Sequence, residues 1–245
     1  MLKGEAHGEP RTVLPPNGAS SLLAGIHLFQ GLTNDVLSEI ELACRYRRFA
    51  ASELIDDRDS SGTDVYFLIQ GSVRIVNYSL SGREIAYEDL HPGQHFGELA
   101  AFDGLPRSAC FIAVEPSLIV ALPGRAFVDL TRRNPEIARR VILRMTHVIR
   151  TANERILDLS TLAAISRVQA ELLRQARPSK AAVNAAVIEP VPIHSDIASR
   201  VSTTRETVAR VLNDLARKGI LERTRDRLMI RDLQRLHDMV EEVRG

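Results

Sequence analysis

Two short segments in the first half of the sequence combine residue types suited to binding a phosphorylated sugar. The first is Phe96-Gly97-Glu98-Leu99-Ala100, and the second, after a short spacer, is Pro106-Arg107-Ser108-Ala109. A glycine lets backbone N–H groups approach an anion, and an arginine presents a planar fork of donors that matches phosphate. The serine hydroxyl adds a donor, and the carboxylate can accept hydrogen bonds from vicinal hydroxyls. The two segments therefore predict a site that binds both a phosphate and a sugar.

A second set of polar residues lies near the C-terminus, in the run TTRETVARVL that begins at Thr203. On a helix, arginine can bind guanine through two hydrogen bonds, and glutamate can accept one from cytosine. Threonine suits phosphate contacts, which position a helix without specifying bases. Glu206 has an alternative role, because with Thr203 as N-cap it completes the T-x-x-E pattern of a capping box. The predicted base readers are Arg205, Glu206 and Arg210, and the predicted phosphate contacts are Thr203, Thr204 and Thr207.

The elements that must position the first site have the pattern of a β-roll. Between Ser52 and Leu122, short apolar runs alternate with turn residues such as Gly71, Ser81-Gly82 and Pro92-Gly93. Regularly spaced turns of this kind predict an antiparallel barrel or roll. Before it, the apolar pattern predicts short helices, with Thr33 as an N-cap. Residues 1–19 are rich in glycine, proline and charge, and we expect a disordered arm.

A long helix is predicted from Pro135, because proline suits the first helical position and neither glycine nor proline follows until Pro178. Its apolar residues recur at alternating spacings of four and three, which is typical of a coiled-coil seam between two chains. An ordinary amphipathic helix that covers its own domain is the alternative. The seam residues are Ala138, Ile142, Met145, Ile149, Ala152, Ile156, Leu159 and Ala163.

The last part of the chain predicts two helices, a tight turn and a β-hairpin, a layout that is used to read DNA. The weakly patterned stretch from Ala176 to Pro192 is expected to be a surface loop. The predicted parts are a helix capped by His194-Ser195-Asp196 that reaches Val201, a helix from about Thr204 to Arg217, strands on either side of Arg225-Asp226, and a final helix capped by Asp232.

Composition narrows the function further. From Ser166 onward there are 15 lysines and arginines against 11 acidic residues, whereas the earlier residues carry 17 against 20, so the predicted DNA-binding part is the basic one. Cys44 and Cys110 are far apart and predict neither a disulfide framework nor a metal site. We find no targeting segment or membrane span and expect a cytoplasmic protein. Catalytic motifs of the hydrolase, P-loop and zinc-protease types are missing, so an enzyme is not expected.

The first two segments resemble the phosphate-binding cassette of the CRP/FNR family, in its cyclic-AMP-receptor-like branch, and the run from Thr203 is similar to the recognition helix of that family. The resemblance implies an α+β chain: a β-roll domain over 20–133, a long dimerisation helix over 134–164, and a winged helix-turn-helix over 165–245. It further implies that Glu98 holds the ribose 2′-hydroxyl and that Arg107 and Ser108 hold a cyclic phosphate. Gly97, Leu99 and Ala109 would contribute backbone. Alternatively, Glu98 and Arg107 form a structural ion pair in a roll that has lost its ligand.

In the family, residues of the long helix contact the base, and the matching positions here are Ala152 and Asn153, with Thr151 one step earlier. The sequence departs from the family pattern at Ala152 and Asn153. Because the Asn153 amide offers both a donor and an acceptor, it can satisfy adenine or guanine. Cyclic AMP is the effector that the resemblance implies, and cyclic GMP is the second candidate. Asn153 alternatively faces solvent or specifies the helix seam.

The function implied by the resemblance is that of a homodimeric transcription regulator. A cyclic nucleotide would promote binding to inverted-repeat DNA, with RNA polymerase as a partner and no metal cofactor. The alternative is the same scaffold responding to another ligand, or active without one. The chain also departs from the family at Arg58-Asp59, where many members have a glycine turn. We expect that loop to differ in shape without functional consequence.

Overall fold

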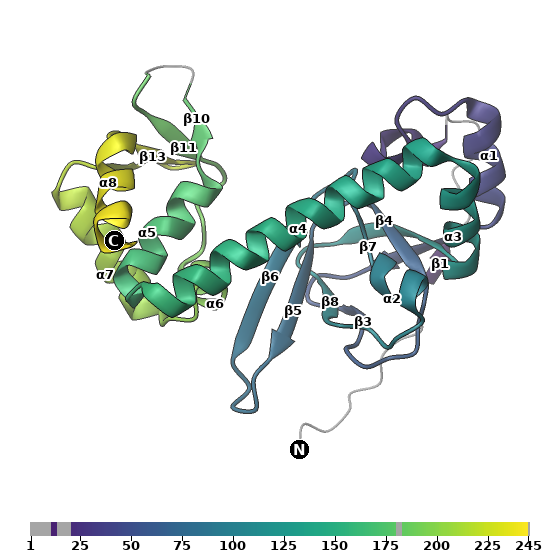
Figure 1. Ribbon diagram of the computed structural model, residues 1–245, viewed down its shortest axis with the longest axis horizontal. Coiled ribbons are helices and arrows are strands. Elements are labelled where there is room, and N and C mark those ends of the chain that lie inside the picture. Colours follow the sequence, from purple (N-terminus) through teal and green to yellow (C-terminus); the bar gives the residue numbers. More distant parts are fainter. Residues whose placement is uncertain (1–10, 14–20, 180–182, 245) are drawn as a thin grey trace. The chain divides into compact units, whose positions relative to one another are not determined.

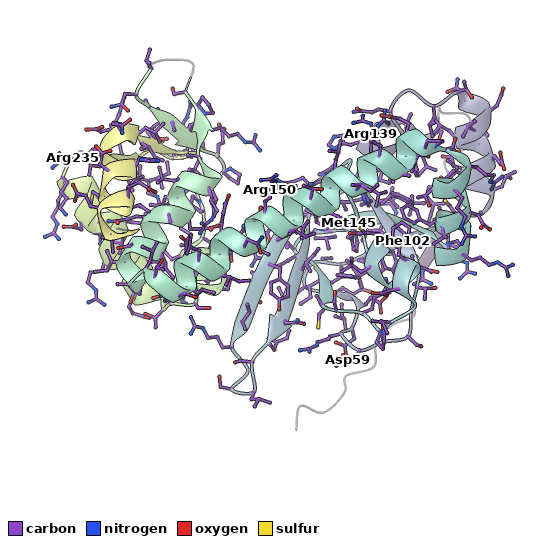
Figure 2. All side chains as sticks on the ribbon, in the orientation of Figure 1. Asp59, Phe102, Arg139, Met145, Arg150 and Arg235 are labelled. Carbon is purple, nitrogen blue, oxygen red and sulfur yellow. The ribbon has the colours of Figure 1, made fainter. Side chains whose placement is uncertain are left out.

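The computed structural model of the protein describes residues 11–13, 21–179 and 183–244 (Figure 1). The chain divides into two compact units, one of Met1–Tyr78 with Ala86–Met145 and one of Ser79–Ile85 with Thr146–Gly245. Each unit has its own interior of packed side chains, and charged residues such as Asp59 and Arg235 lie at the surface (Figure 2). No helix of the described residues is long and apolar enough to cross a membrane.

The first unit is a roll of two antiparallel sheets, as predicted. One sheet has the strand order β1-β2-β9-β4-β7, and the other has the order β3-β8-β5-β6. The strands are β1 (Arg11–Val13), β2 (Arg45–Phe49), β3 (Leu54–Asp56), β4 (Val65–Gln70), β5 (Val73–Tyr78), β6 (Glu84–Leu90), β7 (His95–Phe96), β8 (Cys110–Ala113) and β9 (Ser117–Leu122).

The expectation of a disordered arm over residues 1–19 is wrong for Arg11–Val13. These three residues pair with Tyr46–Arg48 of β2, and a strand forms there because the exposed edge of β2 offers unpaired backbone groups. The remainder of the predicted arm lies outside the described residues.

The turn between β4 and β5 requires a glycine. Gly71 has a φ of 89°, and a Cβ added to it would lie 2.3 Å from Ser117 Oγ and 2.7 Å from the carbonyl oxygen of Pro116. Both the backbone conformation and the close approach exclude a side chain. The glycine that the sequence analysis assigned to this turn is therefore required by the packing of the roll.

Helices close the open side of the first sheet. They are α1 (Asn34–Leu42), α3 (Gly124–Arg133) and the start of α4 (Pro135–Thr161), together with 3-10 turns at Leu22–Gly25 and His27–Phe29. Phe29, Phe67, Phe127 and Ile137 are almost fully buried in the resulting core. The helix α1 starts after Thr33, as the sequence indicates.

The predicted long helix α4 begins at Pro135 and runs for 27 residues. Three of its isoleucines, spaced seven residues apart, are largely exposed in the single chain: Ile142 by 62 %, Ile149 by 59 % and Ile156 by 62 %. Ala163 does not belong to this seam, because α4 ends at Thr161 and Ala163 is the N-cap of the next helix.

The second unit is a winged helix-turn-helix with α5 (Ala164–Gln175), α6 (His194–Arg200), α7 (Arg205–Arg217) and α8 (Leu233–Arg244). Its sheet has the order β10-β11-β13-β12, with β10 (Arg177–Pro178), β11 (Ala186–Ile188), β12 (Leu221–Arg223) and β13 (Leu228–Ile230). The loop expected from Ala176 to Pro192 is therefore partly wrong. It contains β10 and β11, because the apolar Ala186 and Ile188 are buried where β11 pairs with β13.

In the second unit, the cap of α6 differs from expectation and the cap of α8 agrees with it. The N-cap of α6 is Ile193, so His194 is already its first helical residue. Asp232 caps α8 as predicted, since its Oδ1 accepts from the backbone N–H of Arg235 at 3.0 Å.

Candidate functional site

The predicted phosphate cassette is a continuous turn from a strand into a short helix. Gly97 follows β7 with a φ of 86° and is the N-cap of α2 (Glu98–Asp103). A Cβ at Gly97 would lie 2.9 Å from Arg107 Nη1 and 3.0 Å from the carbonyl oxygen of Asp64. Only glycine fits, because the Arg107 side chain packs directly against this backbone. The fold thereby joins the two segments that the sequence analysis singled out.

Glu98 lies in the first turn of α2 and is half-buried. Burial raises the pKa of its carboxyl group, while its own backbone N–H and the charge of Arg144 act in the opposite direction. Arg144, on α4, is held by an ion pair between its Nη2 and Oε2 of Glu88 on β6. The sequence analysis did not identify Glu88 or Arg144, because their contact depends on how α4 packs on the sheet.

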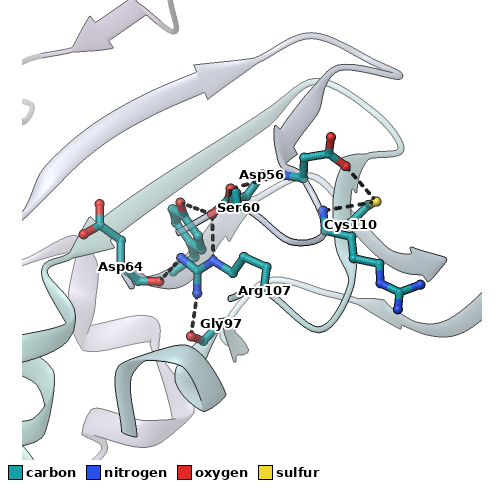
Figure 3. A network of polar contacts seen from close by, with 9 residues as sticks. Asp56, Ser60, Asp64, Gly97, Arg107 and Cys110 are labelled. Atoms are coloured by element: carbon teal, nitrogen blue, oxygen red, sulfur yellow. Dashed lines mark hydrogen bonds and ion pairs between the residues drawn. The ribbon is translucent and has the colours of Figure 1, made fainter. Parts of the chain in front are cut away.

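Arg107 is buried, with a side chain that is 1 % exposed, and its partner is Asp56 rather than Glu98. Its Nε donates to Asp56 Oδ2 at 2.7 Å, its Nη1 to the carbonyl of Gly97 at 2.7 Å, and its Nη2 to the carbonyl of Asp64 at 2.6 Å (Figure 3). The alternative of a structural ion pair between Glu98 and Arg107 is therefore wrong, because the carboxylate that pairs with Arg107 is that of Asp56.

The other cassette residues divide between surface and interior. Ser108 is exposed, Ala109 is 3 % exposed, and Leu99 is 49 % exposed. The carbonyl of Ser108 accepts a hydrogen bond from Asn77 Nδ2 at 3.0 Å. Asn77 is a further positioning residue that sequence analysis missed, since β5 brings it to Ser108 across 31 positions of sequence.

The three residues predicted to contact the base lie on the part of α4 that belongs to the second unit. Thr151 is half-buried, and Ala152 and Asn153 are exposed. Their contact with a nucleotide remains a prediction.

The predicted recognition helix is α7, and its N-cap is Thr204. Thr204 Oγ1 accepts from the backbone N–H of Thr207 at 3.3 Å, whereas Thr203 is buried and its N–H donates to the carbonyl of Ala198. The predicted capping box of Thr203 with Glu206 is therefore wrong by one residue. Thr203 belongs to the tight turn after α6, so Glu206 is the second residue of α7 instead of the third.

Arg205, Glu206 and Arg210 are all exposed on the first two turns of α7. A hydrogen bond from the backbone N–H of Glu206 and another from the Thr204 hydroxyl lower the pKa of the Glu206 carboxyl, so it is ionised at neutral pH. Val208, Val211 and Leu215 face the core of the unit. The helix accordingly presents two guanidinium groups and one carboxylate outward, a set that can read G·C base pairs.

Arg200 is the last residue of α6 and does not suit a role as a phosphate contact. Its side chain is 15 % exposed and lies 3.7 Å from Oε1 of the buried Glu171. The same carboxylate accepts from Arg174 Nε at 3.0 Å, and Arg174 Nη1 donates to the buried Asp158 at 2.6 Å. This network connects α4, α5 and α6 inside the second unit.

Comparison with known proteins finds a family match in each half of the chain. Residues 46–134 match the cyclic nucleotide-binding domain family, and residues 166–239 match the Crp-like helix-turn-helix domain family. The chain is 31 % identical to the cyclic AMP receptor protein of Thermus thermophilus, over 81 % of this chain and 89 % of that protein.

Solved structures share the fold. A CRP/FNR-family transcriptional regulator from Thermus thermophilus is 25 % identical with a TM-score of 0.60, over 82 % of this chain and 100 % of that one. A CooA mutant from Carboxydothermus hydrogenoformans has a TM-score of 0.72 at 20 % identity, over 82 % and 90 % of the two chains. With a cyclic-nucleotide-binding roll and a Crp-like helix-turn-helix in one polypeptide, the chain belongs to the CRP/FNR family of transcription regulators.

Proposed function

We propose that the protein is a homodimeric regulator whose binding to inverted-repeat DNA is promoted by a cyclic nucleotide, with cyclic AMP as the expected effector and cyclic GMP as the second. The observation that carries the proposal is the junction of the two cassette segments. Arg107 contacts the backbone of Gly97, and Glu98 is the next residue. The turn that carries Glu98, an acceptor for the ribose hydroxyl, is thus bonded to Arg107, a cation for the phosphate.

The cassette residues would divide the nucleotide between them. Glu98 would accept from the ribose 2′-hydroxyl, and Arg107 with the exposed Ser108 hydroxyl would bind the cyclic phosphate. The backbone of Gly97, Leu99 and Ala109 would surround it. Thr151, Ala152 and Asn153 are the proposed base contacts, and the Asn153 amide, with Nδ2 as donor and Oδ1 as acceptor, would satisfy either adenine or guanine.

The exposed face of α4 supports a dimer. Ile142, Ile149 and Ile156 repeat every seven residues and are each about three-fifths exposed in the single chain. Such a stripe of apolar side chains is rare on a monomer and typical of a two-stranded helical seam. A second copy of α4 would bury it.

The proposed dimer determines how DNA is read. Two recognition helices related by a two-fold axis contact half-sites about 34–36 Å apart, which is one turn of DNA. The proposed mechanism is a population shift: nucleotide favours the arrangement in which both copies of α7 match the half-sites. By thermodynamic reciprocity, operator DNA must tighten nucleotide binding by the same factor. RNA polymerase is an expected further partner.

Calorimetric titration of the full-length dimer with cyclic AMP and with cyclic GMP tests the proposal. Each titration is made with and without an inverted-repeat duplex, and DNA affinity is measured with and without each nucleotide. We expect at least one nucleotide to bind and to tighten DNA binding reciprocally. If neither nucleotide binds, the scaffold responds to another signal, and if one binds without changing DNA affinity, the proposed coupling fails.

A further inference from the structure

Among the described residues, Arg107 is a tightly constrained cation. Its guanidinium has five N–H donors, and three of them are directed at Asp56, Gly97 and Asp64 at 2.6 to 2.7 Å. Its Cζ atom also lies 5.2 Å and 5.5 Å from the ring centroids of Tyr66 and Phe111. Only 1 % of the Arg107 side chain is exposed. The guanidinium group that is proposed to bind the phosphate is therefore enclosed by protein.

Among the described residues, Asp56 is the charged partner that Arg107 contacts, and its carboxylate has further hydrogen bonds. Its Oδ1 accepts from Ser60 Oγ at 2.6 Å and from the backbone N–H of Asp57 at 3.1 Å. Its Oδ2 accepts from Tyr66 Oη at 3.1 Å as well as from Arg107. Figure 3 shows these bonds converging on one carboxylate.

The loop that follows β3 closes over the pair. The N–H of Asp59 donates to the carbonyl of Arg107, and the N–H of Arg107 donates to the carbonyl of Ser60, both at 3.0 Å. Asp59 has a φ of 64°, and it belongs to the Arg58-Asp59 departure from the family pattern. The segment that departs from the family pattern is thus hydrogen-bonded to the backbone of the residue predicted to bind the phosphate.

A buried guanidinium must have an anion, since an unpaired charge in the interior is strongly destabilising. A carboxylate and a cyclic phosphate are both monoanionic oxygen acceptors that fit the same fork of N–H groups. Resting on the proposed function, we infer that Asp56 is the resident anion of the phosphate site. When a nucleotide binds, its phosphate replaces Asp56 as the ion-pair partner of Arg107. The strength of the Asp56–Arg107 pair therefore sets the effector concentration at which the regulator responds.

The test is calorimetric titration of the full-length Asp56→Asn protein with cyclic AMP and cyclic GMP. Asparagine keeps the shape and hydrogen-bond acceptor of Asp56 while it removes the competing charge. We expect at least about tenfold tighter nucleotide binding than in the wild type, and a larger rise of the thermal midpoint on adding nucleotide. Asp64→Asn is the matched control. It removes a neighbouring charge, but Asp64 contacts Arg107 only through its backbone, so its nucleotide affinity should change little.

A gentler variant covers the case in which Asp56→Asn does not fold. Ser60→Ala removes one neutral hydrogen bond from Asp56 and should tighten nucleotide binding about threefold. Unchanged or weaker binding in folded Asp56→Asn or Ser60→Ala would overturn the inference and leave the proposed function intact. Nucleotide binding by neither the wild type nor any variant would instead overturn the proposed function, and this inference with it.

Discussion

Lowering the pH from 7.5 to 5.0 should destabilise the N-terminal unit through one buried histidine. His95 lies on β7 beside the cassette and is 7 % exposed. Within the described residues, its Nε2 has no hydrogen-bond partner. Burial, and secondarily the positive charge of Arg144, lower the pKa of His95 from its ordinary value of 6.5 to about 4. The fold therefore accommodates the neutral imidazole and resists the charged one.

The sign and size of the effect follow from proton linkage. A depressed histidine pKa contributes stability that is complete above pH 6.5 and is lost as the pH falls from 6.5 toward 4. At pH 5, the unfolded histidine is largely protonated and the folded one is largely neutral. This difference corresponds to about 2 kcal/mol of lost unfolding free energy.

Glu98 acts in the opposite direction. Its pKa is raised by burial, so its contribution to stability is present at low pH and is lost as the pH rises through its folded pKa. The total pH dependence of unfolding thus mixes both groups. Only the difference between the wild type and a histidine variant isolates the contribution of His95.

Urea unfolding at pH 7.5 and 5.0, followed by tyrosine fluorescence, measures this difference. The chain has no tryptophan, and its four tyrosines, at positions 46, 66, 78 and 87, all lie in the N-terminal unit, so the signal reports that unit. His95→Asn should lose about 2 kcal/mol less than the wild type between the two pH values. His91→Asn, which removes an exposed imidazole nearby, is the control. Equal losses in the wild type and His95→Asn would refute the reasoning.

Three further predictions concern the second unit and α4. Arg210→Ala should weaken binding to an inverted-repeat operator by about 1–3 kcal/mol in fluorescence anisotropy, because a side chain that reads guanine is lost. The affinity for nucleotide should stay unchanged. An equal loss of affinity for random DNA would contradict base readout. Ile149→Glu should dissociate the dimer in sedimentation equilibrium, since it buries a charge in the seam, whereas Leu157→Glu on a neighbouring face should not. Asp158→Asn should destabilise the second unit by about 2 kcal/mol in circular dichroism melts, because Arg174 loses one of two buried partners. An unchanged thermal midpoint would show that Glu171 alone is enough to compensate the charge of Arg174.

The elements that the sequence predicted correctly are those specified by residues close together in the chain. Pro135 begins α4 because its fixed φ suits a first helical turn. Gly71 marks the β4–β5 turn because its positive φ favours glycine and a Cβ there would clash with Ser117. The cassette and the recognition helix were identified for the same reason, since each is a short run of residues whose chemistry and spacing are readable without a fold.

Caps and edge strands were predicted less well, because neighbours in space decide them. Thr203 and Thr204 are chemically equivalent as N-caps, and it is the bond from the Thr203 N–H to Ala198 in the preceding helix that makes Thr204 the cap. Residues 186–188 have too short a pattern to indicate a strand by themselves. They become β11 because β13 offers an edge to which they can bond.

The sequence by itself determined the order of the elements and predicted which residue types would bind a phosphate, a sugar and a base. Only the tertiary structure decided what Arg107 contacts. Its partner Asp56 lies 51 positions away, and a loop with no apolar periodicity carries the hydrogen bonds that hold the pair together. Pairing across such a separation depends on how β3 and β8 register in the roll, and local propensity and spacing do not encode that register.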